Sequence, residues 1–124
     1  MRVAEVKKPE NIIHNVVKGL RNLHPLGILH KDIKPDNIFL DADGTCKFGD
    51  FGASVVLPDA APLADSAYLT NDCGTRSYDY AALELIFPKT HDHVGHPQWL
   101  FGQGVNFWAL GIMAYELATG AVLE

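Results

Sequence analysis

Apolar residues near the start of the chain recur at spacings of three and four positions. Between Pro9 and His24 they are Ile12, Ile13, Val16, Val17, Leu20 and Leu23. Side chains at these spacings share one face of a helix, so the pattern predicts an amphipathic α-helix over this stretch. Pro9 suits the first turn of that helix. Pro25 is placed to end it, because proline lacks the backbone N–H that a continuing helix needs.

Two short apolar runs, 28–29 and 38–40, come next, and the second leads into Asp41-Ala42-Asp43-Gly44. This tight-turn sequence precedes Thr45-Cys46-Lys47-Phe48, which predicts a small β-hairpin. The two aspartates also resemble the start of a calcium-binding loop. The twelfth position of such a loop is Gly52, where calcium needs a glutamate, so we favour the hairpin turn.

The second half of the chain alternates predicted loops with predicted helices. Residues 52–80 show no period and form a long predicted loop, of the kind that is usually functional in a compact domain. A short helix is predicted from Tyr80 to Phe87, and a second loop from Pro88 to Gly104. Residues Val105–Thr119 are apolar nearly all round, which predicts a buried helix, and Gly120 suits its C-terminal cap.

Together these elements predict a mainly α fold with a small β-hairpin, in which the helix over 9–24 packs on the helix over 105–119. The chain has 124 residues, of which 48% are hydrophobic and 20% charged, as expected for one small globular domain. The formal net charge is −5, and the longest basic cluster is the pair Lys7-Lys8. This charge argues against nucleic acid or an anionic membrane as the main partner.

The two cysteines, Cys46 and Cys73, make a poor disulfide framework. The first ten residues are charged and lack the apolar segment of a signal peptide, and no apolar run is long enough to span a bilayer. We therefore expect an intracellular, reducing compartment, either cytoplasm or nucleus.

Two polar motifs carry the candidate chemistry. The first, His30-Lys31-Asp32-Ile33-Lys34-Pro35-Asp36-Asn37, puts a carboxylate, an ammonium and an amide on one loop between the first helix and the hairpin. A carboxylate can accept or orient a hydroxyl proton, and a lysine two residues on can neutralise a transferring phosphoryl group. The second motif, Asp50-Phe51-Gly52, follows the hairpin. Its carboxylate and the Asn37 amide are hard oxygen ligands that suit a Mg²⁺-bound polyphosphate.

These motifs, in this order and at this interval, resemble the catalytic loop and the Asp-Phe-Gly motif of eukaryotic-type protein kinases. Gly74-Thr75-Arg76-Ser77-Tyr78 resembles the start of the segment that closes the activation loop of these enzymes. Asn106-Phe107-Trp108-Ala109-Leu110-Gly111 resembles the start of the buried central helix of their large lobe. Four motifs in the family's order cover most of the chain.

The resemblance implies a role for each residue of the site. Asp32 would be the catalytic base, and Lys34 would pair with the γ-phosphate of ATP. Asn37 and Asp50 would ligate Mg²⁺ and thereby bind the nucleotide, while Phe39 would pack under its adenine. The implied cofactors are ATP and Mg²⁺, and the implied substrate is a protein.

Other residues of the motifs have a structural or a class-related reading. His30 and Phe51 would stack in the core beneath the site, and a core histidine is the more frequent role for His30 than proton transfer. Lys34 and Thr75 are typical of the serine/threonine class of the family. A lone Asp-Phe-Gly is a weak signal, since any such tripeptide can be a turn. The three histidines His91, His93 and His96 have no cysteine or carboxylate pattern to complete a metal site, so we favour a solvated insertion.

The sequence departs from the family's pattern in four ways. Over residues 1–124 it resembles a partial kinase domain, a large lobe without the β-rich small lobe and without the last helices. The expected Ala-Pro-Glu is either represented by Ala81-Ala82-Leu83-Glu84, about two residues late, or absent. Asn106 replaces an aspartate, so its hydrogen bonds lack charge assistance. Lys31 replaces an arginine and cannot form the bidentate fork that clasps a phosphorylated activation loop.

Two functions are therefore expected as alternatives. The first is a protein serine/threonine kinase segment that transfers the γ-phosphate of ATP to a protein hydroxyl. The second is a non-catalytic kinase remnant that acts as a protein-binding module. Without a small lobe, Phe39, Leu29 and the hairpin should border an exposed apolar surface that a protein partner or the missing lobe would cover. We expect weak or absent ATP binding by the chain alone, because the remaining groups hold only the phosphate end.

Overall fold

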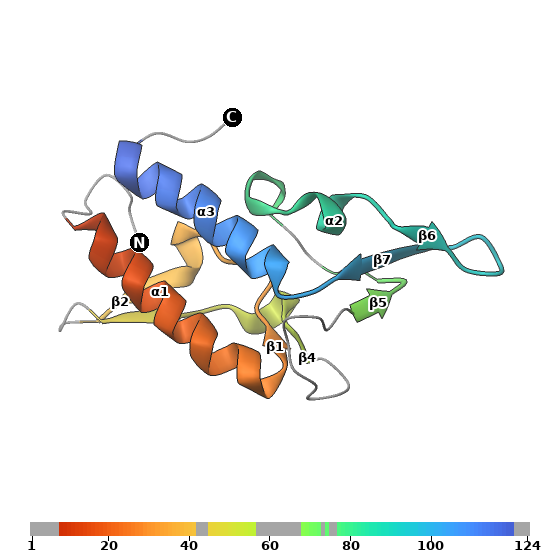
Figure 1. Cartoon of the computed structure of the whole chain (residues 1–124), viewed down its shortest axis with the longest axis horizontal. Coiled ribbons are helices and arrows are strands. Elements are labelled where there is room, and N and C mark those ends of the chain that lie inside the picture. The colour runs from red at the N-terminus through yellow and green to blue at the C-terminus, as the bar shows by residue number, and fades with distance from the viewer. Residues whose placement is uncertain (1–7, 42–44, 57–67, 73, 75–76, 121–124) are drawn as a thin grey trace.

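The computed structural model describes residues 8–41, 45–56, 68–72, 74 and 77–120. Two long helices, α1 (Pro9–Leu23) and α3 (Gly104–Thr119), lie side by side and form the body of the fold (Figure 1). No helix among the described residues is long and apolar enough to cross a membrane. The first helix matches the predicted stretch to within one residue. A 3₁₀ turn at His24–Leu26 follows it, and Gly27, with φ 75°, redirects the chain.

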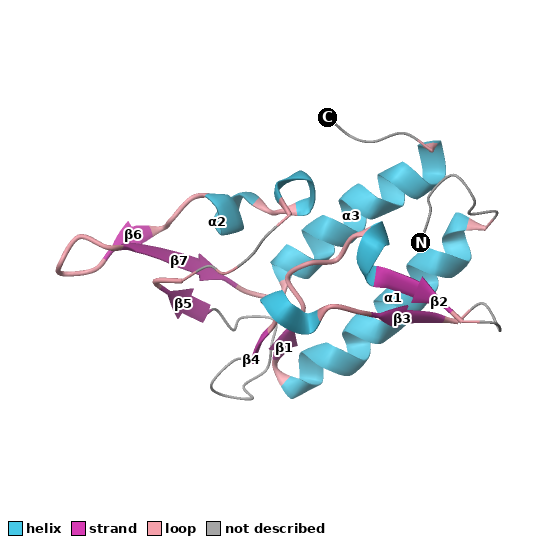
Figure 2. Ribbon diagram, turned by 180° about the vertical axis from the view of Figure 1, so that it is seen from behind, coloured by secondary structure: helices cyan, strands magenta, loops and turns pink. Residues whose placement is uncertain are grey.

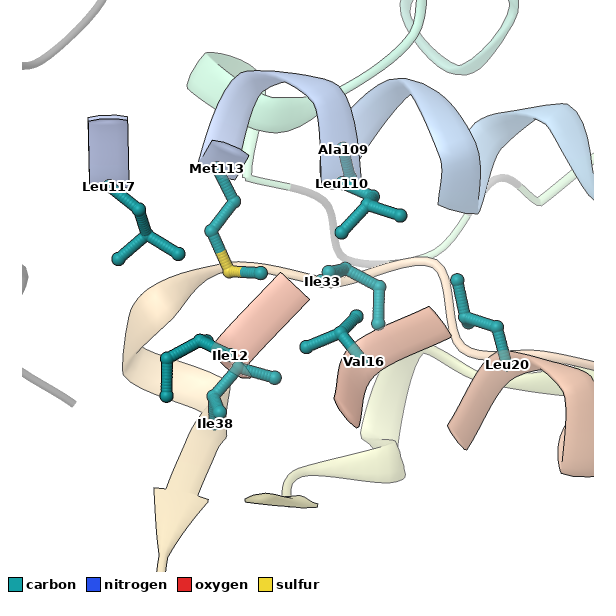
Figure 3. Packing of buried hydrophobic residues seen from close by; sticks show 9 residues of the cluster. All are labelled: Ile12, Val16, Leu20, Ile33, Ile38, Ala109, Leu110, Met113 and Leu117. Atoms are coloured by element: carbon teal, nitrogen blue, oxygen red, sulfur yellow. The ribbon is translucent and has the colours of Figure 1, made fainter. Parts of the chain in front are cut away.

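The packing of α1 on α3 confirms the predicted contact between the two helices. Figure 3 shows the buried side chains that fill the space between them and the loop ahead of the hairpin. They come from α1, from the loop and the start of β2, and from α3, and comprise Ile12, Val16, Leu20, Ile33, Ile38, Ala109, Leu110, Met113 and Leu117. This cluster fixes the loop 30–37 against both helices, because Ile33 lies within that loop and is fully buried.

Helix α3 is buried on one face only. Phe107, Trp108 and Tyr115 are each nearly half exposed, so the prediction of a helix buried all round was wrong for this face. The predicted C-terminal cap is present: Gly120 adopts φ 71° and its N–H bonds to the carbonyl of Glu116 at 2.7 Å.

The predicted hairpin consists of β2 (Ile38–Leu40) and β3 (Cys46–Phe48), which pair antiparallel with Ile38 opposite Phe48. Asp41 supports the start of the turn, since its carboxylate accepts the N–H of Thr45 at 2.9 Å. The other turn residues, 42–44, lie outside the described part of the chain. A second small sheet pairs β1 (Ile28–Leu29) with β4 (Val55–Val56).

A third sheet overturns two loop predictions. The segment 88–104 contains β6 (Thr90–His91) and β7 (Pro97–Phe101), and β5 (Tyr68–Thr70) pairs with the other edge of β7. The loop assigned to 52–80 therefore also contains strand. The sequence signal for these strands is weak for two reasons. Gly95, Pro97 and the histidines lie among them, and the apolar alternation of Trp99 and Phe101 is short. Figure 2 shows this sheet at the end of the molecule farthest from the hairpin.

The predicted helix from Tyr80 to Phe87 is shorter in the structure. It consists of a 3₁₀ turn at Tyr78–Tyr80 and of α2 (Leu83–Ile86). Together with the sheet, this region builds a second buried cluster formed by Leu29, Ala81, Ala82, Leu85, Phe101 and Val105. Leu29 is fully buried there, so the prediction that it borders an exposed surface was wrong.

The tightness of the α1–α3 packing can be tested with Met113→Ala. Because Met113 is fully buried between the helices, its truncation should cost about 2–5 kcal/mol of the free energy of unfolding. Tyr115→Ala, on the half-exposed face of the same helix, is the matched control and should cost less. Urea unfolding followed by circular dichroism measures both, and equal losses would contradict the packing.

Candidate functional site

The loop 30–37 is anchored by His30, whose side chain is fully buried. Its Nδ1 accepts the N–H of Asp32 at 3.1 Å, so Nε2 carries the ring proton and donates it to the carbonyl of Gly49 at 2.9 Å. The ring packs against Phe51 at 4.9 Å and Phe48 at 5.5 Å between centroids. Burial lowers the pKa of His30 below its ordinary value, against the opposing effects of the Gly49 bond and of Asp32 and Asp50.

A buried amide, Asn106, ties the loop to both helices. Its Oδ1 accepts the N–H of Lys31 at 3.0 Å, and its Nδ2 lies 2.9 Å from Nε2 of His24. Burial lowers the pKa of His24, which keeps the ring neutral and able to accept that bond. Lys31 has φ 71°, a left-handed conformation that is strained for a lysine, and the bond from Asn106 holds it there.

Asp32, Lys34 and Asn37 are joined by hydrogen bonds. The amide Nδ2 of Asn37 donates to the Asp32 carbonyl at 2.8 Å and to its carboxylate Oδ2 at 3.0 Å. The other carboxylate oxygen, Oδ1, accepts the hydroxyl of Ser77 at 2.7 Å. Lys34 donates to the same hydroxyl oxygen at 2.8 Å. A serine hydroxyl is thus held between a carboxylate and an ammonium.

Sequence reasoning missed Ser77. Its only sequence signal is a hydroxyl within the Gly74–Tyr78 stretch, where Thr75 was the residue singled out. Thr75 lies outside the described residues. The contact to Asp32 spans 45 positions of the chain, so no local pattern predicts it.

Asp50 is connected to this group through the backbone. The N–H of Gly49 bonds to the carbonyl of Asn37 at 2.9 Å, so the hairpin returns the chain beside Asn37 just before Asp50. Asp50 is exposed, has φ 49°, and its carboxylate accepts the N–H of Gly52 at 3.2 Å. The predicted convergence of the Asp50 and Asn37 oxygens on one metal stays a prediction.

The donor set fits Mg²⁺ in kind. Nδ2 of Asn37 makes both bonds to Asp32, which leaves Oδ1 as the oxygen of that amide available to a cation. Asp50 adds an exposed carboxylate, and Mg²⁺ in phosphoryl-transfer sites uses one or two such ligands plus phosphate and water. Within the described residues, no three His, Cys, Asp or Glu side chains gather as a metal site.

Phe39 and Phe51 lie exposed beside these groups. Phe39 is 57% exposed, and its ring lies over Gly49, where any added Cβ would clash with it. Leu40 and Val56 are also exposed. We call these four residues the apolar rim: Phe39, Leu40, Phe51 and Val56. That these four residues form one continuous surface stays a prediction.

Helix α3 carries a buried carboxylate, that of Glu116. Glu116 is only 4% exposed, and its Oε1 is the one fully buried side-chain oxygen or nitrogen without a hydrogen-bond partner in the described part of the chain. The hydroxyl of Tyr80 bonds to this carboxylate. Burial, that bond and the charges of Glu116, Asp36 and Asp79 raise the pKa of Tyr80.

Comparison with known proteins identifies the family. The family model described as protein kinase domain matches residues 2–123. The chain is 39% identical over 105 residues to cGMP-dependent protein kinase 2 of Rattus norvegicus, covering 85% of this chain and 11% of that protein. It is 38% identical over 108 residues to an Aurora kinase of Patiria pectinifera, covering 87% and 22%. It is 32% identical over 105 residues to serine/threonine-protein kinase AtPK1/AtPK6 of Arabidopsis thaliana, covering 85% and 19%.

The chain therefore belongs to the eukaryotic-type protein kinase family, in its serine/threonine class. ATP binding is expected for this family. The chain spans between 11% and 22% of the length of these three relatives.

The neutral state of His24 makes stability depend on pH. Its folded pKa lies below the ordinary 6.5, so the unfolded chain binds more protons as the pH falls. The contribution of the neutral ring is complete above about pH 7 and is lost as the pH falls below about 6.5. The buried ring of His30 acts in the same direction.

Urea unfolding at pH 7.5 and 5.5 should therefore show a lower free energy of unfolding at the acidic pH. Asn106→Asp should reduce this loss, because a carboxylate beside His24 raises the pKa of that ring. Proton resonances of the ring, followed through the titration, report the pKa directly. An unchanged pH dependence in Asn106→Asp would contradict the pairing of His24 with residue 106.

Proposed function

We propose that the chain is the catalytic segment of a protein serine/threonine kinase, corresponding to part of the large lobe. In this proposal it transfers the γ-phosphate of ATP to a serine or threonine hydroxyl of a protein. The observation that carries the proposal is the hydroxyl of Ser77, held at 2.7 Å from the carboxylate of Asp32 and 2.8 Å from the ammonium of Lys34. Those two groups are the ones that phosphoryl transfer to a hydroxyl needs.

Asp32 acts on the accepting hydroxyl. A carboxylate offers about four lone-pair directions, and the described bonds from Ser77 and Asn37 use two of them. A substrate hydroxyl bound at the remaining directions is oriented toward the γ-phosphate and gives its proton to Asp32. The new O–P bond forms as the bond to the β-phosphate oxygen breaks, and ADP leaves.

Lys34 and Asn37 stabilise the same step. Lys34 has three N–H donors and spends one on Ser77, so two remain for the oxygens of the transferring phosphoryl group. Asn37 orients Asp32 through Nδ2 and offers Oδ1, with Asp50, to Mg²⁺. When bound there, Mg²⁺ supplies neutralisation of the phosphate charge.

The apolar rim is where we propose that a protein partner or a small lobe docks. Phe39 would face the adenine on this surface. ATP should bind weakly when the rim is uncovered, because the remaining groups hold only the phosphate end of the nucleotide. The proposed site of action is intracellular, in keeping with a half-buried free cysteine, Cys46.

The proposed role of Asp32 can be tested with Asp32→Asn. The change keeps the shape of the side chain but removes the base, so transfer of labelled phosphate from Mg-ATP to a serine peptide should fall about 10²- to 10⁴-fold. Asp79→Asn, an exposed carboxylate outside the site, is the control and should retain activity. High nucleotide concentrations compensate for weak ATP binding.

Two outcomes separate the alternatives. Undiminished transfer by Asp32→Asn would contradict the assignment of the base. Absence of transfer by the unmodified chain, with peptide binding retained, would favour the non-catalytic binding module.

Glu116 supports a preference for basic substrates. Tyr80, which bonds to Glu116, is itself linked to Ser77, because its N–H donates to the Ser77 carbonyl at 3.0 Å. Glu116 is therefore connected to Ser77 through Tyr80, and Asp36 adds negative charge near Tyr80. A buried carboxylate oxygen without a partner is costly. In this proposal an arginine of a bound peptide satisfies it, which requires the side chains that cover Glu116 to move apart when the peptide binds.

A peptide with an arginine near its serine should bind the chain more tightly than the same peptide with citrulline. A charge-assisted hydrogen bond of about 1.5–3 kcal/mol corresponds to about a 10- to 100-fold difference in Kd. Glu116→Gln should abolish that difference, whereas Glu84→Gln, on the exposed face of α2, should preserve it. Fluorescence anisotropy measures the Kd values, and an arginine preference that survives Glu116→Gln would rule out this subsite.

A further inference from the structure

The sheet β5–β7–β6 joins two segments that are far apart in the sequence. Tyr68, Leu69 and Thr70 pair with Phe101, Leu100 and Trp99 on one edge of β7. On the other edge, Thr90 and His91 pair with Gln98 and Pro97. The hairpin 88–101 therefore holds β5 by direct backbone pairing. Figures 1 and 2 show β5 alongside β7.

Side chains lock the end of β5 to the tip of this hairpin. The amide of Asn71 donates to Oδ2 of Asp92 and to the carbonyl of Pro97, both at 3.1 Å. Asp92 is itself fixed, because its Oδ1 accepts the N–H groups of Val94 and His96 at 3.0 and 2.9 Å. Asn71 thus bonds to a tip that is already ordered.

The base of the hairpin is anchored in the second buried cluster. Phe101 is only 2% exposed and packs there with Leu85 and Val105. Trp99 packs against the same cluster, and its ring N–H lies 3.5 Å from the carbonyl of Ile86. The sheet is therefore rigidly attached to the body of the fold.

The sheet also contacts the ammonium of Lys31, which lies in the loop 30–37. Lys31 is 6% exposed, and its ammonium lies 4.6 Å from the centre of the Phe101 ring, a cation–π contact. A Cβ added at Gly74 would lie 3.7 Å from that ammonium, so the chain after β5 passes close to it. A phosphoryl group commonly orders such a segment through a cationic side chain. Here the cation at this position is buried against β7.

We propose that the hairpin β6–β7 is a built-in brace that positions residues 68–72 and 74 beside Lys31 without a phosphoryl group on the chain. The backbone pairing of β5, the bonds of Asn71 and the contact of Lys31 with Phe101 hold the described parts of this segment. The significance of that position for catalysis rests on the proposed function, but the brace itself does not.

Hydrogen–deuterium exchange of the full chain, treated with phosphatase and verified by mass, tests the brace. The amides of residues 68–72 should be protected, and phosphatase treatment should leave their protection unchanged. Asn71→Ala should speed their exchange about tenfold, since it removes two hydrogen bonds from the brace. Asn15→Ala is the matched control, because its amide bonds only within α1, to the Asn11 carbonyl, and exchange of 68–72 should stay the same.

A second variant distinguishes a specific lock from general loosening. Asn71→Asp puts a like charge beside Asp92, so exchange of 68–72 should be faster than in Asn71→Ala at low salt and should slow toward it in 1 M salt, where charges are screened over about 3 Å. Protection of α1 should not change in any variant. Unprotected 68–72 amides in the dephosphorylated chain, or no effect of either Asn71 variant, would overturn the proposal. Because exchange needs no ATP, a failure of phosphate transfer leaves this result intact.

Discussion

The fold depends on one buried amide more than on any other polar group. Asn106, on α3, bonds to the backbone of Lys31 in the loop 30–37 and to the ring of His24 just after α1. It therefore joins the two long helices and the loop between them at a single point. The apolar cluster between α1 and α3 supplies the bulk of the packing. Apolar packing is non-directional, so it does not by itself fix the backbone conformation of the loop. The amide sets the left-handed turn at Lys31, and that turn aims Asp32.

The parts of the fold that could be predicted from the sequence are those with a local signal. Helix α1 has a clear apolar period and proline boundaries, and the hairpin β2–β3 has a turn sequence followed by β-forming residues. The third sheet has neither, because its strands have two to five residues and β5 and β7 find each other across about thirty positions. Pairing at such distance is decided by tertiary packing, here by Trp99 and Phe101 entering the second cluster.

The residues of the candidate site differ in the same way, since some have a local sequence signal and others do not. Asp32, Lys34 and Asn37 lie within six positions of one another, so their proximity follows from the sequence. Ser77 contacts Asp32 across 45 positions of the chain, so no local spacing could indicate it. Burial was misjudged where it depends on neighbours in space: Leu29 is enclosed by α2 and β7, whereas Trp108 and Tyr115 on α3 remain nearly half exposed.

Two departures from the family's pattern, Asn106 and Lys31, affect how charge is placed around the loop 30–37. Asn106 in place of an aspartate pairs a neutral amide with a neutral His24, so the support of the loop carries no buried charge. Lys31 in place of an arginine lies against an aromatic ring of β7, so its buried ammonium gains a cation–π contact there. Burying a charge is costly unless it is paired, and the neutral pair of Asn106 and His24 avoids that cost at the point where the loop 30–37 is held. The charged groups that the proposed reaction would neutralise, Asp32, Lys34 and Asp50, lie outside this neutral pair.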